Sequence, residues 1–148
     1  MPGTISGVLT KIDKYTRKIV YTCVGAVQNG DTGTVPDRTT DEDRFQGDKL
    51  TGFIKGWSLV FVVAYPTPSG KAPDAADITV KQTGIDLLGA GGANLIHATN
   101  PLSVPAKIST SVVPYPIYDV LTVGVTNHVT ASGEFTIELI FKKPINYG

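Results

Sequence analysis

The sequence predicts an all-β protein, an antiparallel β-sandwich of jelly-roll-like form with about eight strands and one long polar loop. The first observation behind this prediction is that 16 glycines and 10 prolines interrupt the chain throughout. The longest stretch free of both runs from Val8 to Val24 and has a turn-like DKYT at its centre, which leaves little room for helices. The second observation is that apolar and polar residues alternate with a period of two, which is typical of strands with one buried face.

The two segments nearest the C-terminus show the alternation most clearly. They are DVLTVGVTN, residues 119–127, and EFTIELIFKK, residues 134–143. The apolar positions are Leu121, Val123 and Val125 in the first and Phe135, Ile137, Leu139 and Phe141 in the second. The connection between them, NHVTASG, is polar and ends in Gly133, which favours a hairpin. We therefore predict that these two strands pair side by side.

Several earlier segments are predicted as strands from less regular patterns. They are residues 5–12, 17–24, 50–65 with a break near Gly56, 76–82, 94–98 and 106–113. The segment WSLVFVVAY differs because it is apolar on both faces, with Trp57, Leu59, Phe61 and Val63 on one and Val60, Val62 and Ala64 on the other. Such a strand is central in a stack of layers, or one of its faces meets another subunit.

Residues 28–49, QNGDTGTVPDRTTDEDRFQGDK, form a long polar segment whose apolar side chains are Val35 and Phe45. Loops of this length are either mobile or functional. Two interpretations remain open. The segment is either a solvated loop or an arm that orders against a neighbouring subunit, with Phe45 as its anchor.

Length and charge narrow the class of protein. A chain of 148 residues suits one domain, so we predict a single β-sandwich domain over residues 1–148. Lys+Arg and Asp+Glu both number 13, which argues against a nucleic-acid groove or a membrane-binding basic patch. The longest apolar run, residues 59–65, is far shorter than the ~20 residues that span a bilayer. The start, MPGTISG, lacks the features of a secretory signal.

The glycine-rich stretch GAGGAN is the first candidate for chemistry. Gly89 and Gly91 fit a GxGxxG dinucleotide fingerprint, but Asn94 stands in place of the third glycine. Pro101 interrupts the chain before a helix could develop. We therefore predict a tight loop whose glycines adopt positive φ angles.

The other combinations of reactive residues do not predict a catalytic or metal site. The acidic cluster of Asp37, Asp41, Glu42, Asp43 and Asp48 lacks EF-hand spacing, and basic residues are interspersed in it. Cys23, His97 and His128 do not have zinc-ligand spacing, and a single cysteine excludes an intramolecular disulfide. Glu134 and Glu138 lie on one predicted strand, and no GxSxG motif is present. We expect no enzyme activity, no catalytic residues, no metal and no cofactor.

Residues 76–142 resemble a pattern in small virion proteins of tailed bacteriophages. The matching stretches are ADITVKQTGIDLLGAGGANLIHATNP and DVLTVGVTNHVTASGEFTIELIFKK, with a proline-containing strand between them. The pattern consists of a D-I-T-V strand followed by D-x-L-x-G and G-A-N, and it closes with L-T-V-x-V-x-N and a G-x-F-T-I strand. Proteins of this kind are β-sandwich or jelly-roll modules, and some are trimeric cement or decoration proteins that bridge major capsid subunits.

The resemblance implies a non-enzymatic capsid cement or decoration protein. It would be made in the host cytoplasm, act on the capsid surface of the virion as a homo-oligomer, with a trimer favoured, and bind the major capsid protein rather than nucleic acid or membrane. The alternative is a collar, head-fibre or tail-associated β-sandwich module, which could bind carbohydrate. Because arginine and aromatic residues are favoured at interfaces, the candidate contact residues are Arg38, Arg44, Phe45, Tyr115 and Tyr118.

Overall fold

The structure is a computed structural model that describes residues 3–25, 35–66, 76–96, 100–108, 111–126 and 133–143. It is an all-β fold, and every strand pairing within these ranges is antiparallel. The helix α1, Leu50–Ile54, is a short exception. The predicted fold class is therefore confirmed as all-β and antiparallel.

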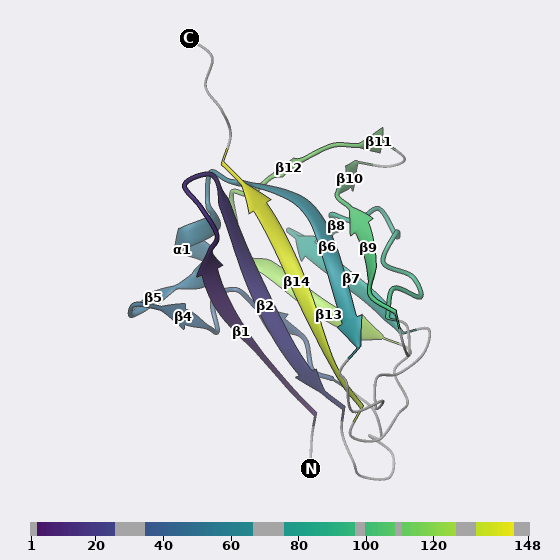
Figure 1. Ribbon diagram of the computed structural model, residues 1–148. Helices are drawn as coiled ribbons and strands as arrows, with labels where there is room; N and C mark the ends of the chain where they lie inside the picture. Colours follow the sequence, from purple (N-terminus) through teal and green to yellow (C-terminus); the bar gives the residue numbers. More distant parts are fainter. Residues whose placement is uncertain are drawn as a thin grey trace.

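The larger sheet has the strand order β1-β2-β14-β6, and β9 and β12 both pair with β6. The strands are β1 (Thr4–Lys11), β2 (Thr16–Val24), β14 (Glu134–Lys142), β6 (Ser58–Pro66), β9 (Leu102–Pro105) and β12 (Tyr115–Pro116). Figure 1 shows β1, β2, β14 and β6 as a row of long strands, with β1 at one edge and β9 beyond β6. The C-terminal strand β14 is thus central in this sheet.

The smaller sheet has the order β3-β13-β7-β8 and lies behind the larger one in Figure 1. Its strands are β3 (Arg38–Thr39), β13 (Leu121–Thr126), β7 (Asp77–Gln82) and β8 (Ile85–Asp86). Two short ladders complete the described part, β4 (Arg44–Phe45) with β5 (Asp48–Lys49) and β10 (Lys107–Ile108) with β11 (Ser111–Val112).

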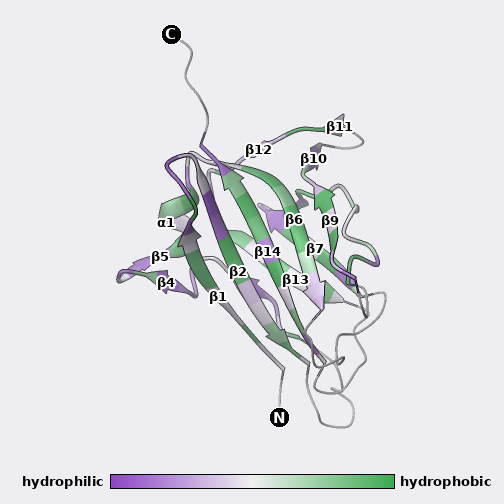
Figure 2. Cartoon of the chain, viewed as in Figure 1, coloured by the Kyte–Doolittle hydropathy of each residue, from purple (hydrophilic) through white to green (hydrophobic). Residues whose placement is uncertain are grey.

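One cluster of buried side chains joins the two sheets. Ile19, Phe135 and Leu139 from the larger sheet belong to the same cluster as Val80 and Val123 from the smaller one. Burying each such side chain contributes about 1.5–3 kcal/mol. Figure 2 shows hydrophobic segments along β6 and β14, whereas the β4–β5 ladder is hydrophilic. Two antiparallel sheets with a common core make the architecture sandwich-like.

The predicted hairpin of the last two strands is wrong. Both segments are strands, and their predicted apolar positions are buried. However, β13 pairs with β3 and β7, whereas β14 pairs with β2 and β6. The reason is that alternation specifies which face is buried but not which strand lies alongside. The connection, residues 127–132, lies outside the described residues.

Three other strand predictions need correction. The predicted strand 50–65 begins as helix α1, because Leu50 and Ile54 are four residues apart and both bury on one helical face. The predicted strand 106–113 is two short strands, β10 and β11. Of residues 94–98, Ile96 forms an isolated bridge with Ala76, and residues 97–99 lie outside the described part. The strand β9 was not predicted.

The face assignment for WSLVFVVAY fails beyond Leu59. The register between β6 and β14 shifts, because Phe141 lies opposite Leu59 but Ile140 lies opposite Phe61. Val60 is therefore an extra residue, as in a β-bulge, and the strand changes face there. Leu59, Val62 and Ala64 are buried, whereas Phe61 and Val63 are half-buried.

The polar segment 28–49 is structured over its second half. Residues 35–49 contain β3, a turn, and the β4–β5 ladder, and β3 pairs with β13. Residues 28–34 lie outside the described part. We call the stretch from Arg38 to Lys55, which includes α1, the polar excursion. Over its described length it is not a simple solvated loop, and its ordering against a neighbouring subunit stays a prediction.

Candidate functional site

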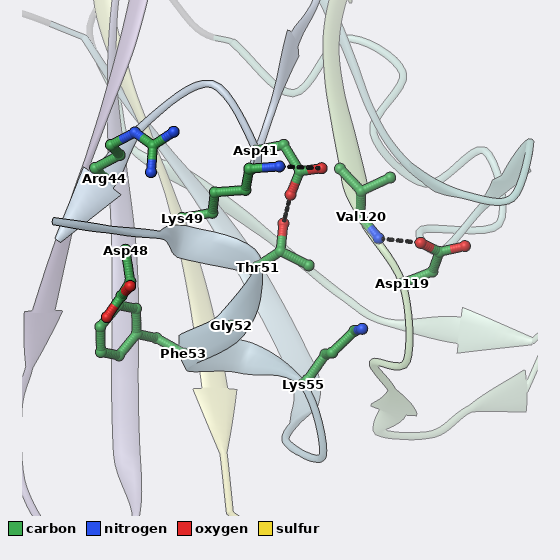
Figure 3. A pocket seen from close by; sticks show the side chains of 10 residues that line it. All are labelled: Asp41, Arg44, Asp48, Lys49, Thr51, Gly52, Phe53, Lys55, Asp119 and Val120. Carbon is green, nitrogen blue, oxygen red and sulfur yellow. Dashed lines mark hydrogen bonds and ion pairs between the residues drawn. The ribbon is translucent and has the colours of Figure 1, made fainter.

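An open pocket of about 650 Å³ lies between the polar excursion and the residues that lead into β13. It is lined by Asp41, Arg44, Asp48, Lys49, Thr51, Gly52, Phe53, Lys55, Asp119 and Val120. Figure 3 shows Arg44 and Asp48 on one side, Asp119 and Val120 on the other, and Asp41 and Thr51 between them. Two segments far apart in the sequence thus meet at one site.

A chain of buried hydroxyl groups ties the polar excursion to the smaller sheet. The amide of Leu121 donates to Thr40 Oγ1 at 3.1 Å, and Thr40 Oγ1 lies 2.6 Å from Thr51 Oγ1. Thr51 Oγ1 donates to Asp41 Oδ1 at 2.5 Å. Since Thr51 donates to the carboxylate, the Thr40 hydroxyl donates to Thr51. This chain fixes the Asp41 carboxylate in the centre of the pocket.

The charges of the pocket lining balance. Asp41, Asp48 and Asp119 face Arg44, Lys49 and Lys55. Lys49 Nζ lies 3.9 Å from Asp41 Oδ2, and both side chains are well exposed, so this pair contributes little to stability. The Arg44 guanidinium donates to the carbonyl of Gly47, and Asp119 Oδ1 accepts from the amide of Val120. The pocket therefore presents charges of both signs in equal number, and Asp41, Arg44 and Asp119 among them are held by hydrogen bonds.

Gln82 holds the other wall of the pocket. Its side chain is buried at the end of β7. Nε2 donates to the carbonyl of Pro116 at 3.2 Å, and Oε1 accepts from the amides of Tyr118 and Asp119 at 3.0 and 3.2 Å. The sequence analysis missed this residue. The available signal was a polar residue at the inward-facing position after Ile78 and Val80 in the alternation of β7.

Arg38 and Arg44, two of the predicted contact residues, have different environments. Arg38 makes a bidentate pair with Asp43 at 2.9 and 2.7 Å and also donates to Glu42. These hydrogen bonds, chiefly that to Asp43, raise the pKa of Arg38 above its ordinary value. Its guanidinium is thus occupied within the chain. Arg44 is exposed at the pocket wall, where a partner could reach it.

Phe45 packs against its own chain. Its ring lies edge-to-face with Phe53 at 5.1 Å between centroids, and the Lys11 ammonium lies 5.4 Å from the Phe45 centroid. The backbone carbonyl of Phe53 in turn accepts a hydrogen bond from the Arg17 guanidinium, which stacks over the ring of Trp57 at 4.3 Å from its centroid. The half-buried Phe45 therefore joins the polar excursion to the larger sheet, and only part of its ring is accessible to a neighbour.

The two predicted tyrosines, Tyr115 and Tyr118, are not among the residues that line the pocket. Tyr115 is half-buried and lies opposite Leu59 in the β12–β6 pairing. Tyr118 is 59% exposed, with its hydroxyl 3.3 Å from Thr83 Oγ1. The structure thus places Arg44 in one wall of the pocket, whereas Tyr118 precedes Asp119 in the chain and does not line the pocket.

The glycine-rich segment is a packed turn. The predicted positive φ is found at Gly89, at 56°, but not at Gly91 or Gly92, and the other positive φ angles of the segment belong to Ala90 and Asn94, at 64° and 55°. Gly92 is needed for space, because a Cβ there would lie 1.9 Å from the carbonyl oxygen of Ile78. The Asp86 carboxylate accepts from amides of the same turn, which occupies it within the fold.

Among the described residues, no group of three His, Cys, Asp or Glu side chains could hold a metal ion. His97 and His128 lie outside the described part. Cys23 is a buried free thiol, and burial raises its pKa to about 12. Within the same residues, no helix is long and apolar enough to cross a membrane.

Comparison with known proteins gave no relatives. No protein-family model, no curated protein and no solved structure matches this chain.

Proposed function

We propose that the protein is a non-enzymatic structural component of a bacteriophage virion, a cement or decoration protein that binds the outside of the capsid and bridges major capsid subunits. Two features support the proposal. The architecture is sandwich-like and antiparallel, and the sequence pattern of residues 76–142 resembles that of small virion proteins. The protein would be made in the host cytoplasm and assembled onto the virion.

The observation that carries the proposal is the pocket with its balanced charges, of which two carboxylates are held by hydrogen bonds. Asp41 is held by Thr51, and Asp119 by the amide of Val120. Carboxylates engaged in this way suit a contact surface, where charges of both signs select a partner by complementarity. Arg44 and Tyr118 are exposed beside them and are of the residue types favoured at interfaces.

The mechanism of capsid stabilisation would be multivalent. Each copy makes a modest contact with the capsid, and linking copies in a homo-oligomer raises the avidity by about 10²–10⁴ without any new contact. The resemblance favours a trimer.

The test is binding to capsids that lack the protein. We expect the purified chain to co-sediment with such capsids and to raise their melting temperature. Charge reversal by Arg44→Glu with Lys55→Glu should weaken binding at least about tenfold, because both side chains line the pocket. The matched control is Lys81→Glu with Lys143→Glu, which changes the net charge by the same amount at exposed positions outside the pocket lining. Capsids that neither bind the chain nor gain stability would refute the proposal.

The pocket also favours one alternative, a collar, head-fibre or tail-associated module that binds carbohydrate. Carboxylate and ammonium groups lie there beside the ring of Phe53, and such groups hydrogen-bond and pack against sugars. A glycan array separates the two functions. Sugar binding that is lost in Asp41→Asn would favour the alternative, and an array without binding would favour the cement protein.

A further inference from the structure

The first strand, β1, is a long edge strand that contacts β4, with Lys11 over the rings of Phe45 and Phe53, and that otherwise lacks the usual protection against pairing among the described residues. It pairs with β2 on one side, and no strand in the described ranges pairs with its other side. Its eight residues, TISGVLTK, contain no proline and a single charge, Lys11, at the end. The register with β2 runs without a shift from Thr4 opposite Val24 to Lys11 opposite Arg17. Edge strands are ordinarily blunted by prolines, central charges or bulges.

The phase of the ladder shows which backbone groups are free. The amide of Ile12 donates to the carbonyl of Thr16, directly after the last β1–β2 pair. Since bonded and non-bonded pairs alternate in an antiparallel ladder, the even-numbered residues of β1 bond to β2. The odd-numbered residues Ile5, Gly7 and Leu9 therefore direct their amides and carbonyls away from β2.

The opposite edge of the same sheet is protected. β9 has four residues, follows Pro101 and ends at Pro105, and β12 ends at Pro116. Proline has no backbone N–H to donate to a neighbouring strand, so a further strand would pair poorly with β9 or β12. Head-to-tail pairing of β1 with that edge of a second copy is thus disfavoured. Pairing of β1 with itself remains.

We propose that β1 pairs antiparallel with β1 of a second copy across a two-fold axis at Gly7. This register places Ile5 opposite Leu9 of the second copy twice, and about six backbone hydrogen bonds form. Lys11 lies opposite Gly3 of the second copy, so like charges do not meet. Sliding the pairing by two residues would oppose Lys11 to Ile5 or Leu9 to Gly3, which loses the Ile5–Leu9 pairs. The first of these slides is centred on Val8 and would instead place the exposed Val8 side chains opposite each other. Of these three registers, the one centred on Gly7 alone keeps both Ile5–Leu9 pairs, and we propose that register for this reason.

Two features fit a second copy as the occupant. The interface is isologous, the commonest arrangement in homo-oligomers. On the outer face, Val8 is 62% exposed and would lie opposite Ser6 of the second copy. The proposed oligomer is a dimer, whereas the resemblance favours a trimer. The dimer proposal does not depend on the virion role.

The test uses charges placed across the axis. We expect the wild-type chain to sediment at twice its mass of 15.7 kDa. Ser6 and Val8 are exposed, so the S6K/V8K variant should fold. In the dimer it places two pairs of lysines opposite each other across the axis, which should raise the dimer dissociation constant about tenfold or more. The S6K/V8E variant opposes Lys to Glu twice and should remain dimeric. The control S111K/T126K adds the same charge at exposed positions on β11 and β13, outside the larger sheet, and should also remain dimeric.

Several results would overturn the proposal. They are a monomer at concentrations up to about millimolar, a trimer, or a dimer that S6K/V8K leaves intact. A monomer whose capsid binding is lost in S6K/V8K would assign the edge to a strand of the capsid protein instead. Capsid binding is scored separately, so a dimer that does not bind capsids contradicts the proposed function alone, and a capsid-binding monomer contradicts the dimer alone.

Discussion

Gly92 and Gly52 have opposite surroundings, which makes them a matched pair for testing the packing of single residues. A Cβ on Gly92 would lie 1.9 Å from the backbone oxygen of Ile78, whereas nothing lies within 4 Å of a Cβ on Gly52 in α1. We expect Gly92→Ala to lower the free energy of unfolding by about 2–4 kcal/mol, because the backbone must move. Gly52→Ala should raise it by about 0.5–1 kcal/mol. Urea denaturation measures both, and equal effects would contradict the packing of the turn.

Gln82 is a second residue with a large expected effect. Gln82→Met keeps the side-chain size but leaves the carbonyl of Pro116 and the amides of Tyr118 and Asp119 without their partners. We expect a loss of about 2–4 kcal/mol in the free energy of unfolding. The neighbouring exposed Lys81→Ala should change it by less than about 0.5 kcal/mol. If the two variants are equally stable, Gln82 does not hold the pocket wall.

Two buried groups make the fold sensitive to alkali. Burial raises the pKa of Cys23 from 9.0 to about 12 and also raises that of Tyr21, with the charge of Asp43 adding to the effect. The unfolded chain loses these protons at lower pH than the folded chain. The contribution of the buried thiol to the free energy of unfolding is therefore fully present below pH 9.0 and is lost as the pH rises toward 12.

The alkaline dependence can be assigned to Cys23 by substitution. Cys23→Ala should flatten the decline of the unfolding free energy between the ordinary pKa values of the thiol and of the tyrosine, 9.0 and 10.0. Denaturation at a series of pH values provides the measurement. An unchanged slope in the variant would show that the thiol is not responsible.

At the scale of elements, the pattern of the sequence predicts strands better than their partners. The bounds of β1, β2, β7, β13 and β14 were predicted to within one or two residues, because each alternates across one buried face. The pairing of β13 was not predictable, since inward-facing residues are the same whether a strand joins one sheet or the other. Helix α1 and the bulge at Val60 were also missed, because an apolar segment of this length fits strand and helix alike.

The candidate site was predictable only in part. Arg44 was predicted as a contact residue from its type and its polar segment, and it does line the pocket. Asp119 and Lys55 were not singled out, because they approach Arg44 only through the tertiary fold. Gln82 could have been noticed, since a polar residue at an inward position of a strand needs buried partners.

The position of a strand in its sheet also determines how tightly its amides are held. β14 pairs along its length with strands on both sides, whereas the β4–β5 ladder is two residues deep. We expect amides of residues 135–141 to exchange with deuterium far more slowly than those of residues 44–49. Mass spectrometry of exchanged peptides measures this difference. Equal protection would contradict the central place of β14.

At the scale of the whole molecule, the proposed associations would use two separate features. The polar excursion and the Gln82-held segment form a pocket of balanced charges. Along one edge of the larger sheet, β1 leaves amides and carbonyls free to pair with a second copy. A dimer formed at that edge would carry two pockets, and two contacts with one capsid bind more tightly than either alone.

The virion role is tested most directly by immunogold electron microscopy of intact phage particles with an antibody against this chain. A cement protein on the capsid surface predicts gold particles distributed over the heads. Label confined to tails or collars, or particles without label, would contradict it.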